Sequence, residues 1–176
     1  MSTQSSADAG QLLLDAAGIV VLCGSEKDMA HANQIVAAAR ELGLAAVIRI
    51  ASAHRTPEKA LQIIRDVNAL SQRVPVVLVT VAGRSNALSG FCDPQTVVPV
   101  IACPPPSDFA DDVWSSLRMP TGVAPLYVCE PTNAALAAAK IIGLSNRGIS
   151  EKIADFQQSA RQKIEEADAC ARSASR

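Results

Sequence analysis

The sequence lacks any marked excess of charge of one sign. Its 176 residues carry a formal net charge of -1, with a pI of about 6.1, and the basic residues form no long stripe. Nucleic-acid binding draws much of its free energy from counterions that Lys and Arg side chains displace from phosphates. This chain has no obvious source of that binding free energy. The composition instead favours a small-molecule ligand.

Closely paired cysteines and targeting segments are also lacking. The five cysteines are scattered without a CxxC pair, which favours buried free thiols in a reducing cytosol over metal ligands or disulfides. No basic segment precedes the first apolar stretch, and Asp15 interrupts LLLDAAGIVVLCG, so neither a signal peptide nor a membrane span is expected. We therefore expect a cytoplasmic protein.

What the chain does contain is an alternation of Val- and Ile-rich runs with Ala-rich segments, which is typical of a parallel sheet with crossover helices. With 49% hydrophobic residues, its length suits a single core. The fold class is therefore predicted to be α/β, with a parallel sheet of about five strands. The expected strands are GIVVLC, AAVIRIA, PVVLVTV, VPVIACP and APLYVC, and the expected helices cover 28–42, 57–69, 84–91, 111–117 and 131–144.

Both ends of the chain differ from this pattern. We expect residues 1–17 to be a disordered tail, 18–147 to form the domain, and 148–176 to form a projecting helix. Because the five-stranded domain is already complete, the apolar stripe of that helix is predicted to contact another subunit. The stripe consists of Ile149, Ile153, Phe156, Ala160, Ile164 and Ala167, at three- and four-residue spacing.

Polar residues follow each expected strand, at the sheet edge where parallel α/β folds bind ligands. In GSEKD, after the first strand, Ser25 can cap the next helix and Asp28 can accept two ribose hydroxyls, although ordinary capping explains the motif equally well. Neither a GxGxxG nor a Walker A motif is present, so a dinucleotide or ATP lacks its usual phosphate site. No nucleotide cofactor is therefore expected.

The segment SAHRTPEK follows the second strand and carries a stronger signal. Its Thr-Pro pair fits the start of a helix, which leaves Ser52, His54 and Arg55 unexplained. If the first two strands are neighbours, Ser25, Ser52 and Arg55 can converge on one phosphate. His54 would lie beside it, where it could transfer a proton or serve only as a further phosphate ligand. The residues alone leave both roles open.

The segment AGRSN follows the third strand and is rich in hydrogen-bond donors. Gly83 permits a close approach of the backbone to a ligand, and Arg84, Ser85 and Asn86 come next, at an expected helix start. Such a donor cluster suits a carboxylate or a bicarbonate-derived group. Solvent-facing capping would use the same residue types.

Three further residues are weaker candidates. Arg118 lies in DDVWSSLRMPTG, and this sequence context does not indicate its role. Trp114, the one tryptophan, is expected to pack against the protein instead of stacking on a substrate. His31 is expected at a solvated position of the first helix.

Considered together, these motifs resemble the PurE family of the purine pathway, from about Ile19 to Asn146. The GS pair with Asp28, SAHRTP, PVIACPP and NAALAAAKI are similar to the family as a whole. VAGRSNALSG and DVWSSLRMPTG are similar to its class II members, the aminoimidazole ribonucleotide carboxylases that animals carry fused to a second enzyme. The bacterial mutase class has an Ala-Ala-His-Leu-Pro-Gly stretch after the third strand, which this chain lacks.

The resemblance implies a three-layer, flavodoxin-like fold that assembles as a homo-octamer, without metal, ATP or biotin. The implied activity is carboxylation of 5-aminoimidazole ribonucleotide by carbon dioxide. The loop AGRSN would steady the developing carboxylate. The implied site residues are Ser25, Ser52 and Arg55 for the phosphate, Asp28 for the ribose and His54 for proton transfer.

One departure from class II bears on the alternatives. Animal class II enzymes usually have Lys-Gly-Pro where this chain has Arg55-Thr56-Pro57, as the mutases do. A class I mutase would move the carboxyl group from the N-carboxy isomer of the same ribonucleotide. A PurE-like carboxylase could instead act on a pyridine nucleotide. A noncatalytic nucleotide-binding scaffold would need the phosphate ligands but would have no use for His54.

Overall fold

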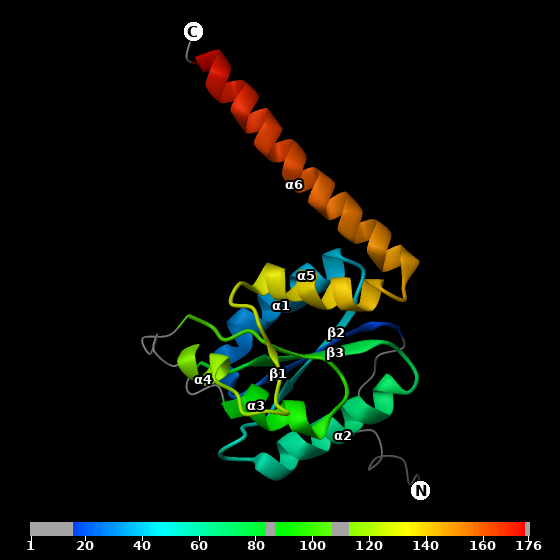
Figure 1. Ribbon diagram of the computed structural model, residues 1–176, viewed down its shortest axis with the longest axis vertical. Coiled ribbons are helices and arrows are strands. Elements are labelled where there is room, and N and C mark those ends of the chain that lie inside the picture. The colour runs from blue at the N-terminus through cyan, green and yellow to red at the C-terminus, as the bar shows by residue number, and fades with distance from the viewer. Residues whose placement is uncertain (1–15, 84–86, 107–112, 175–176) are drawn as a thin grey trace, which may run out of the picture.

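The computed structural model describes residues 16–83, 87–106 and 113–174, which form one parallel sheet between two layers of helices (Figure 1). The sheet order is β2-β1-β3-β4-β5, and all neighbouring strands are parallel. The predicted α/β, flavodoxin-like fold is therefore confirmed. The strands are β1 (Gly18–Cys23), β2 (Ala45–Ile50), β3 (Val76–Val81), β4 (Val100–Ala102) and β5 (Leu126–Tyr127).

Helices cover both faces of the sheet because successive strand residues point to opposite sides. In β1, Val21 packs in the core with α1 and α5, whereas Leu22 packs with α2 and α3 on the other face. Figure 1 shows the same division into layers. The helical elements are η1 (Glu26–Asp28), α1 (Met29–Glu41), α2 (Pro57–Ser71), α3 (Ala87–Cys92), η2 (Asp93–Gln95), α4 (Val113–Leu117), α5 (Pro131–Gly143) and α6 (Arg147–Ala174).

β4 and β5 are shorter than the apolar runs that predicted them. β4 has three residues and β5 has two. Pro99 and Pro104 lie on either side of the β4 region, and Pro125 immediately precedes β5. Proline has no N–H to donate to a strand ladder, so it limits the length of both pairings.

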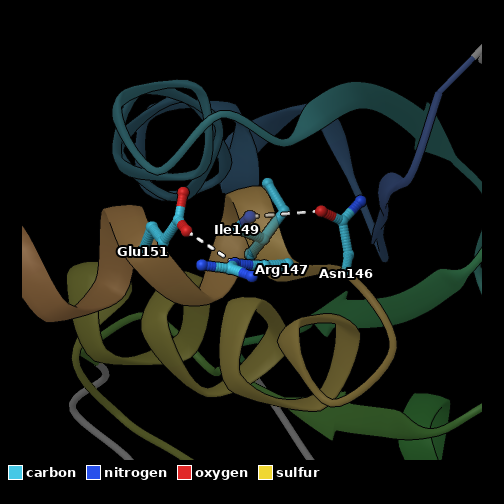
Figure 2. A network of polar contacts seen from close by, with 4 residues as sticks. All are labelled: Asn146, Arg147, Ile149 and Glu151. Carbon is cyan, nitrogen blue, oxygen red and sulfur yellow. Dashed lines mark hydrogen bonds and ion pairs between the residues drawn. The ribbon is translucent and has the colours of Figure 1, made fainter.

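A side-chain cap fixes the start of α6, which then extends away from the domain (Figures 1 and 2). The Oδ1 atom of Asn146 accepts a hydrogen bond of 3.2 Å from the Ile149 N–H, and Arg147 pairs with Glu151 at 2.9 Å. Ile149 is buried, whereas Ile164, further along the apolar stripe, is 71% exposed. The projecting helix is confirmed. Its contact with another subunit stays a prediction.

All five cysteines are free, but they are not all buried as expected. Cys23, Cys92 and Cys103 are buried, and burial raises the pKa of each of these thiols to about 12. Cys129 and Cys170 are exposed. Within residues 16–83, 87–106 and 113–174, no cluster of three or more His, Cys, Asp or Glu side chains could hold a metal ion.

No helix in the described part of the chain combines the length and the apolar character that a membrane span needs. Even α6, with 28 residues, carries charged side chains along its length.

Candidate active site

Asp28 lies just beyond the carboxyl end of β1, at the end of η1, and it is only 6% exposed. Its Oδ2 atom accepts hydrogen bonds from the Ser25 N–H at 2.8 Å and from the Ser25 hydroxyl at 2.9 Å. Ser25 is the residue that precedes η1, as expected, but its hydroxyl is turned toward Asp28. A carboxylate has about four acceptor positions, so the two bonds from Ser25 leave roughly two, on Oδ1, for a ligand.

Two glycines bring the main chain close to this carboxylate from adjacent strands. A Cβ atom on Gly24 would lie 3.6 Å from Oδ2, and one on Gly83 would lie 3.8 Å from Oδ1. Gly24 follows β1 and Gly83 follows β3, and these strands pair at the centre of the sheet. From β1 the chain continues into α1, on one face of the sheet, whereas it enters β3 from α2, on the opposite face. Such a switch point opens the crevice in which parallel α/β folds bind ligands.

The SAHRTP turn after β2 approaches the same crevice. The Ala51 N–H donates to the Cys23 carbonyl at 2.9 Å, and Nη2 of Arg55 lies 3.5 Å from the Gly24 carbonyl. The expectation that the first two strands are neighbours is confirmed by the β1–β2 pairing. The structure thus brings Arg55 to the turn that carries Ser25. Phosphate binding by these groups stays a prediction.

Hydrogen bonds within the SAHRTP turn hold its shape. The Ser52 hydroxyl accepts the Arg55 N–H at 3.2 Å, and the Thr56 hydroxyl accepts the Ser52 N–H at 2.9 Å. Thr56 and Pro57 occupy the start of α2 as expected, but the Thr56 hydroxyl bonds within the turn and makes no cap to the helix. His54 and Arg55 are exposed at the tip of this turn.

Not every predicted site residue joins this cluster. Arg118 follows α4, and its guanidinium lies 5.2 Å from the centroid of the Trp114 ring. Trp114 is 54% exposed, so the expectation that it packs into the protein is wrong for the single chain. The contacts found in the described residues do not connect Arg118 with Asp28 or Arg55. The three donors at 84–86 lie outside the described residues.

The expectation that His31 faces solvent is wrong, because its side chain is only 8% exposed. Its Nε2 atom lies 3.4 Å from the Sγ atom of Cys103, at the end of β4. Burial lowers the pKa of His31 below its ordinary value of 6.5, although the Asp28 and Glu130 carboxylates and the backbone of Cys103 oppose this shift. The imidazole is therefore neutral near pH 7. The four-residue spacing of His31 and the buried Ile35 is the signal that could have revealed its position.

Residues 18–163, which include every element of this crevice, match the family model described as AIR carboxylase. The chain belongs to the AIR carboxylase family. A phosphoribosylaminoimidazole carboxylase of Archaeoglobus fulgidus is 50% identical over 151 residues, which are 85% of this chain and 82% of that protein. The crystal structure of Treponema denticola PurE has a TM-score of 0.82 and 44% identity, covering 86% of this chain and 96% of that one.

Animal members of the AIR carboxylase family match as well. The human bifunctional phosphoribosylaminoimidazole carboxylase/phosphoribosylaminoimidazole succinocarboxamide synthetase is 40% identical over 137 residues, which are 77% of this chain but 32% of that protein. The predicted resemblance to the PurE family, including the animal carboxylases, is confirmed. This chain is thus an enzyme of the AIR carboxylase family.

Proposed function

We propose that this enzyme adds carbon dioxide to a ring carbon of 5-aminoimidazole ribonucleotide in purine biosynthesis, reversibly and without ATP. The observation that carries the proposal is the family match across 18–163, supported by 50% identity to a phosphoribosylaminoimidazole carboxylase. The product is carboxyaminoimidazole ribonucleotide. No metal or nucleotide cofactor takes part.

The crevice between the loops after β1, β2 and β3 offers separate groups for the two polar parts of this substrate. In the proposal, Arg55 and the Ser52 hydroxyl hold the phosphate, aided by the amino ends of the helical elements. The Ser25 hydroxyl joins them by turning away from Asp28 Oδ2, which keeps its bond from the Ser25 N–H. Asp28 accepts the ribose hydroxyls through Oδ1, because Oδ2 is already bonded to Ser25. The aminoimidazole then extends toward His54.

The chemistry requires one bond to form and one proton to leave. The electron-rich ring carbon attacks carbon dioxide, which forms the carbon–carbon bond and leaves a tetrahedral carbon that still carries its hydrogen. His54 accepts that proton as the bond electrons return to the ring and restore its aromaticity, and it returns the proton in the reverse reaction. The backbone at Gly83 and the donors at 84–86 steady the developing carboxylate. Alignment of the two reactants lowers the barrier by up to several kcal/mol.

An absorbance assay with 5-aminoimidazole ribonucleotide and bicarbonate, run with and without ATP, tests the proposed reaction. We expect equal carboxylation under both conditions. Turnover of only the N-carboxy isomer would identify the mutase, toward which the Arg-Thr-Pro segment points. Substrate binding without exchange of carbon from labelled bicarbonate would identify a noncatalytic scaffold.

The exposed part of α6 supports a proposal about how the chain assembles. We infer that the stripe of α6 packs on other copies of the chain in a homo-octamer, since Ile164 is 71% exposed and Ile149 is buried on the same stripe. Light scattering after size-exclusion chromatography should give eight times the chain mass of 18.3 kDa. Ile164→Glu should give a smaller particle, and an octamer of that variant would contradict the assignment.

The free thiols suit the reducing cytoplasm, where we place the enzyme.

A further inference from the structure

A buried histidine adjoins the proposed ribose-binding carboxylate, and the proposed reaction does not use it. His31 lies on α1 three residues after Asp28, so the two side chains occupy the same end of the helix. It is 8% exposed, and its Nε2 atom lies 3.4 Å from the Cys103 Sγ atom. A polar ring that is more than nine-tenths buried needs a hydrogen-bond partner, and this thiol supplies one.

The surroundings of Cys103 indicate the direction of that hydrogen bond. Its Sγ atom lies 3.6 Å from the Cys129 carbonyl oxygen, which can only accept. The thiol therefore donates to Cys129, and its sulfur accepts the Nε2–H of a neutral His31. The carboxylates of Asp28, in η1, and Glu130, at the start of α5, lie near enough to the ring to oppose the lowering of its pKa.

Cys103 in turn leads into the loop that borders the crevice. Its N–H donates to the Thr80 carbonyl of β3 at 2.9 Å, which fixes the end of β4 against β3. Two residues later, Pro105 lies so close to Gly83 that a Cβ on this glycine would be 3.2 Å from the proline Cγ atom. The bond from His31 to Cys103 thus ties the helix end that carries Asp28 to the loop that packs on Gly83.

We propose that His31 is a positioning residue that holds the Asp28 carboxylate at a fixed spacing from the Gly83 backbone through its hydrogen bond to Cys103. The inference rests on the proposed function, in which Asp28 binds the ribose. His54 lies on the separate loop after β2. Loss of the His31 bond therefore weakens substrate binding and leaves the proton-transfer step almost unchanged.

Two substitutions of His31 distinguish the effect of losing its hydrogen bond from the effect of changing the side chain's volume. In His31→Gln, the side-chain amide nitrogen can occupy the place of Nε2 and donate to Cys103. In His31→Asn, the shorter side chain places its amide near Nδ1, too far from the thiol. We expect His31→Asn to raise KM for 5-aminoimidazole ribonucleotide roughly fivefold to tenfold, with kcat within about twofold of wild type. His31→Gln should restore KM to within about twofold of the wild-type value.

Cys103→Ala provides an independent test from the other partner. It should raise KM about as much as His31→Asn does, and the double variant should be no worse than either single one, because both remove the same bond. Equal KM values for His31→Asn and wild type would overturn the inference, as would a loss confined to kcat. If His31→Asn fails to fold, Cys103→Ala and His31→Gln decide the question.

The two proposals can fail separately. If the wild-type chain binds the ribonucleotide but carboxylates nothing, the proposed function fails, and calorimetric binding of the same ribonucleotide still tests His31. If the wild-type chain is an active carboxylase and His31→Asn binds substrate equally well, only the inference about His31 fails. Thermal unfolding of each variant shows whether a change in KM reflects a loss of folded protein.

Discussion

Replacing Asp28 with Asn tests whether this carboxylate binds Ser25 through Oδ2 and the ribose through Oδ1. The amide oxygen of Asp28→Asn can keep the two bonds from Ser25, at 2.8 and 2.9 Å in the native chain. The amide NH2 group then occupies the place of Oδ1, where the account puts the ribose hydroxyls. Two hydrogen bonds to a charged acceptor are lost, and each such bond contributes about 1.5–3 kcal/mol. Allowing for partial compensation by the amide, we expect KM to rise roughly 100-fold, equivalent to about 2.7 kcal/mol.

The assay is a comparison of KM for 5-aminoimidazole ribonucleotide with the midpoint of thermal unfolding. Because the amide keeps the bonds from Ser25, Asp28→Asn should unfold at nearly the wild-type temperature. Asp93→Asn is the matched control, since Asp93 also accepts a backbone N–H, that of Ala124 at 2.7 Å, but lies in η2. It should leave KM unchanged. A KM of Asp28→Asn within about threefold of wild type would refute the assignment of Oδ1 to the ribose.

Three further predictions concern stability. Gly18→Ala should lower the free energy of unfolding by about 3 kcal/mol, because its Cβ would lie 2.2 Å from the Ala45 carbonyl oxygen of β2; an unchanged urea midpoint would contradict this spacing. Gly43→Ala and Gly122→Ala should each destabilise by about 1 kcal/mol, since both glycines have positive φ, 81° and 92°, and the lysine side chain 2.7 Å from the new Cβ of Gly43 is flexible enough to move aside; an unchanged urea midpoint for both would contradict this. Because the pKa of His31 is lowered in the folded chain, the unfolded chain binds a proton at this histidine more readily than the folded chain does. The neutral buried ring therefore contributes fully to the free energy of unfolding above about pH 6.5. That contribution is lost as the pH falls from there toward the folded-state pKa. Unfolding measured against pH should therefore show wild type losing stability relative to His31→Gln on acidification, and a constant difference would contradict the burial of a neutral ring.

The strands could be predicted because buried parallel strands need continuous apolar runs. GIVVLC corresponds residue for residue to β1, and all six of its residues are buried. The ends of β4 and β5 were predicted less well, because apolar composition continued into segments where Pro99 and Pro125 limit the ladder. Composition thus predicted which runs form strands, and backbone hydrogen bonding determined how long the strands are.

The site was only partly predictable for a similar reason. The polar groups after β1 and β2 could be placed at one edge because neighbouring parallel strands end together, and the contact of Arg55 with Gly24 agrees with this. The burial of His31 depends on Cys103, which is 72 residues away in the sequence. Short-range spacing alone does not identify such a partner. Thr56 lies at the start of α2 as the Thr-Pro pair predicts, but its hydroxyl accepts the Ser52 N–H within its own turn and does not cap the helix.

The most direct test of the proposed chemistry is single-turnover carboxylation by His54→Asn, with ribonucleotide binding measured on the same protein by calorimetry. The account predicts that this variant binds 5-aminoimidazole ribonucleotide with an affinity close to wild type and carboxylates it at least about 100-fold more slowly, because the ring proton has no base to accept it. Carboxylation at the wild-type rate by a variant that binds substrate normally would contradict the role of His54.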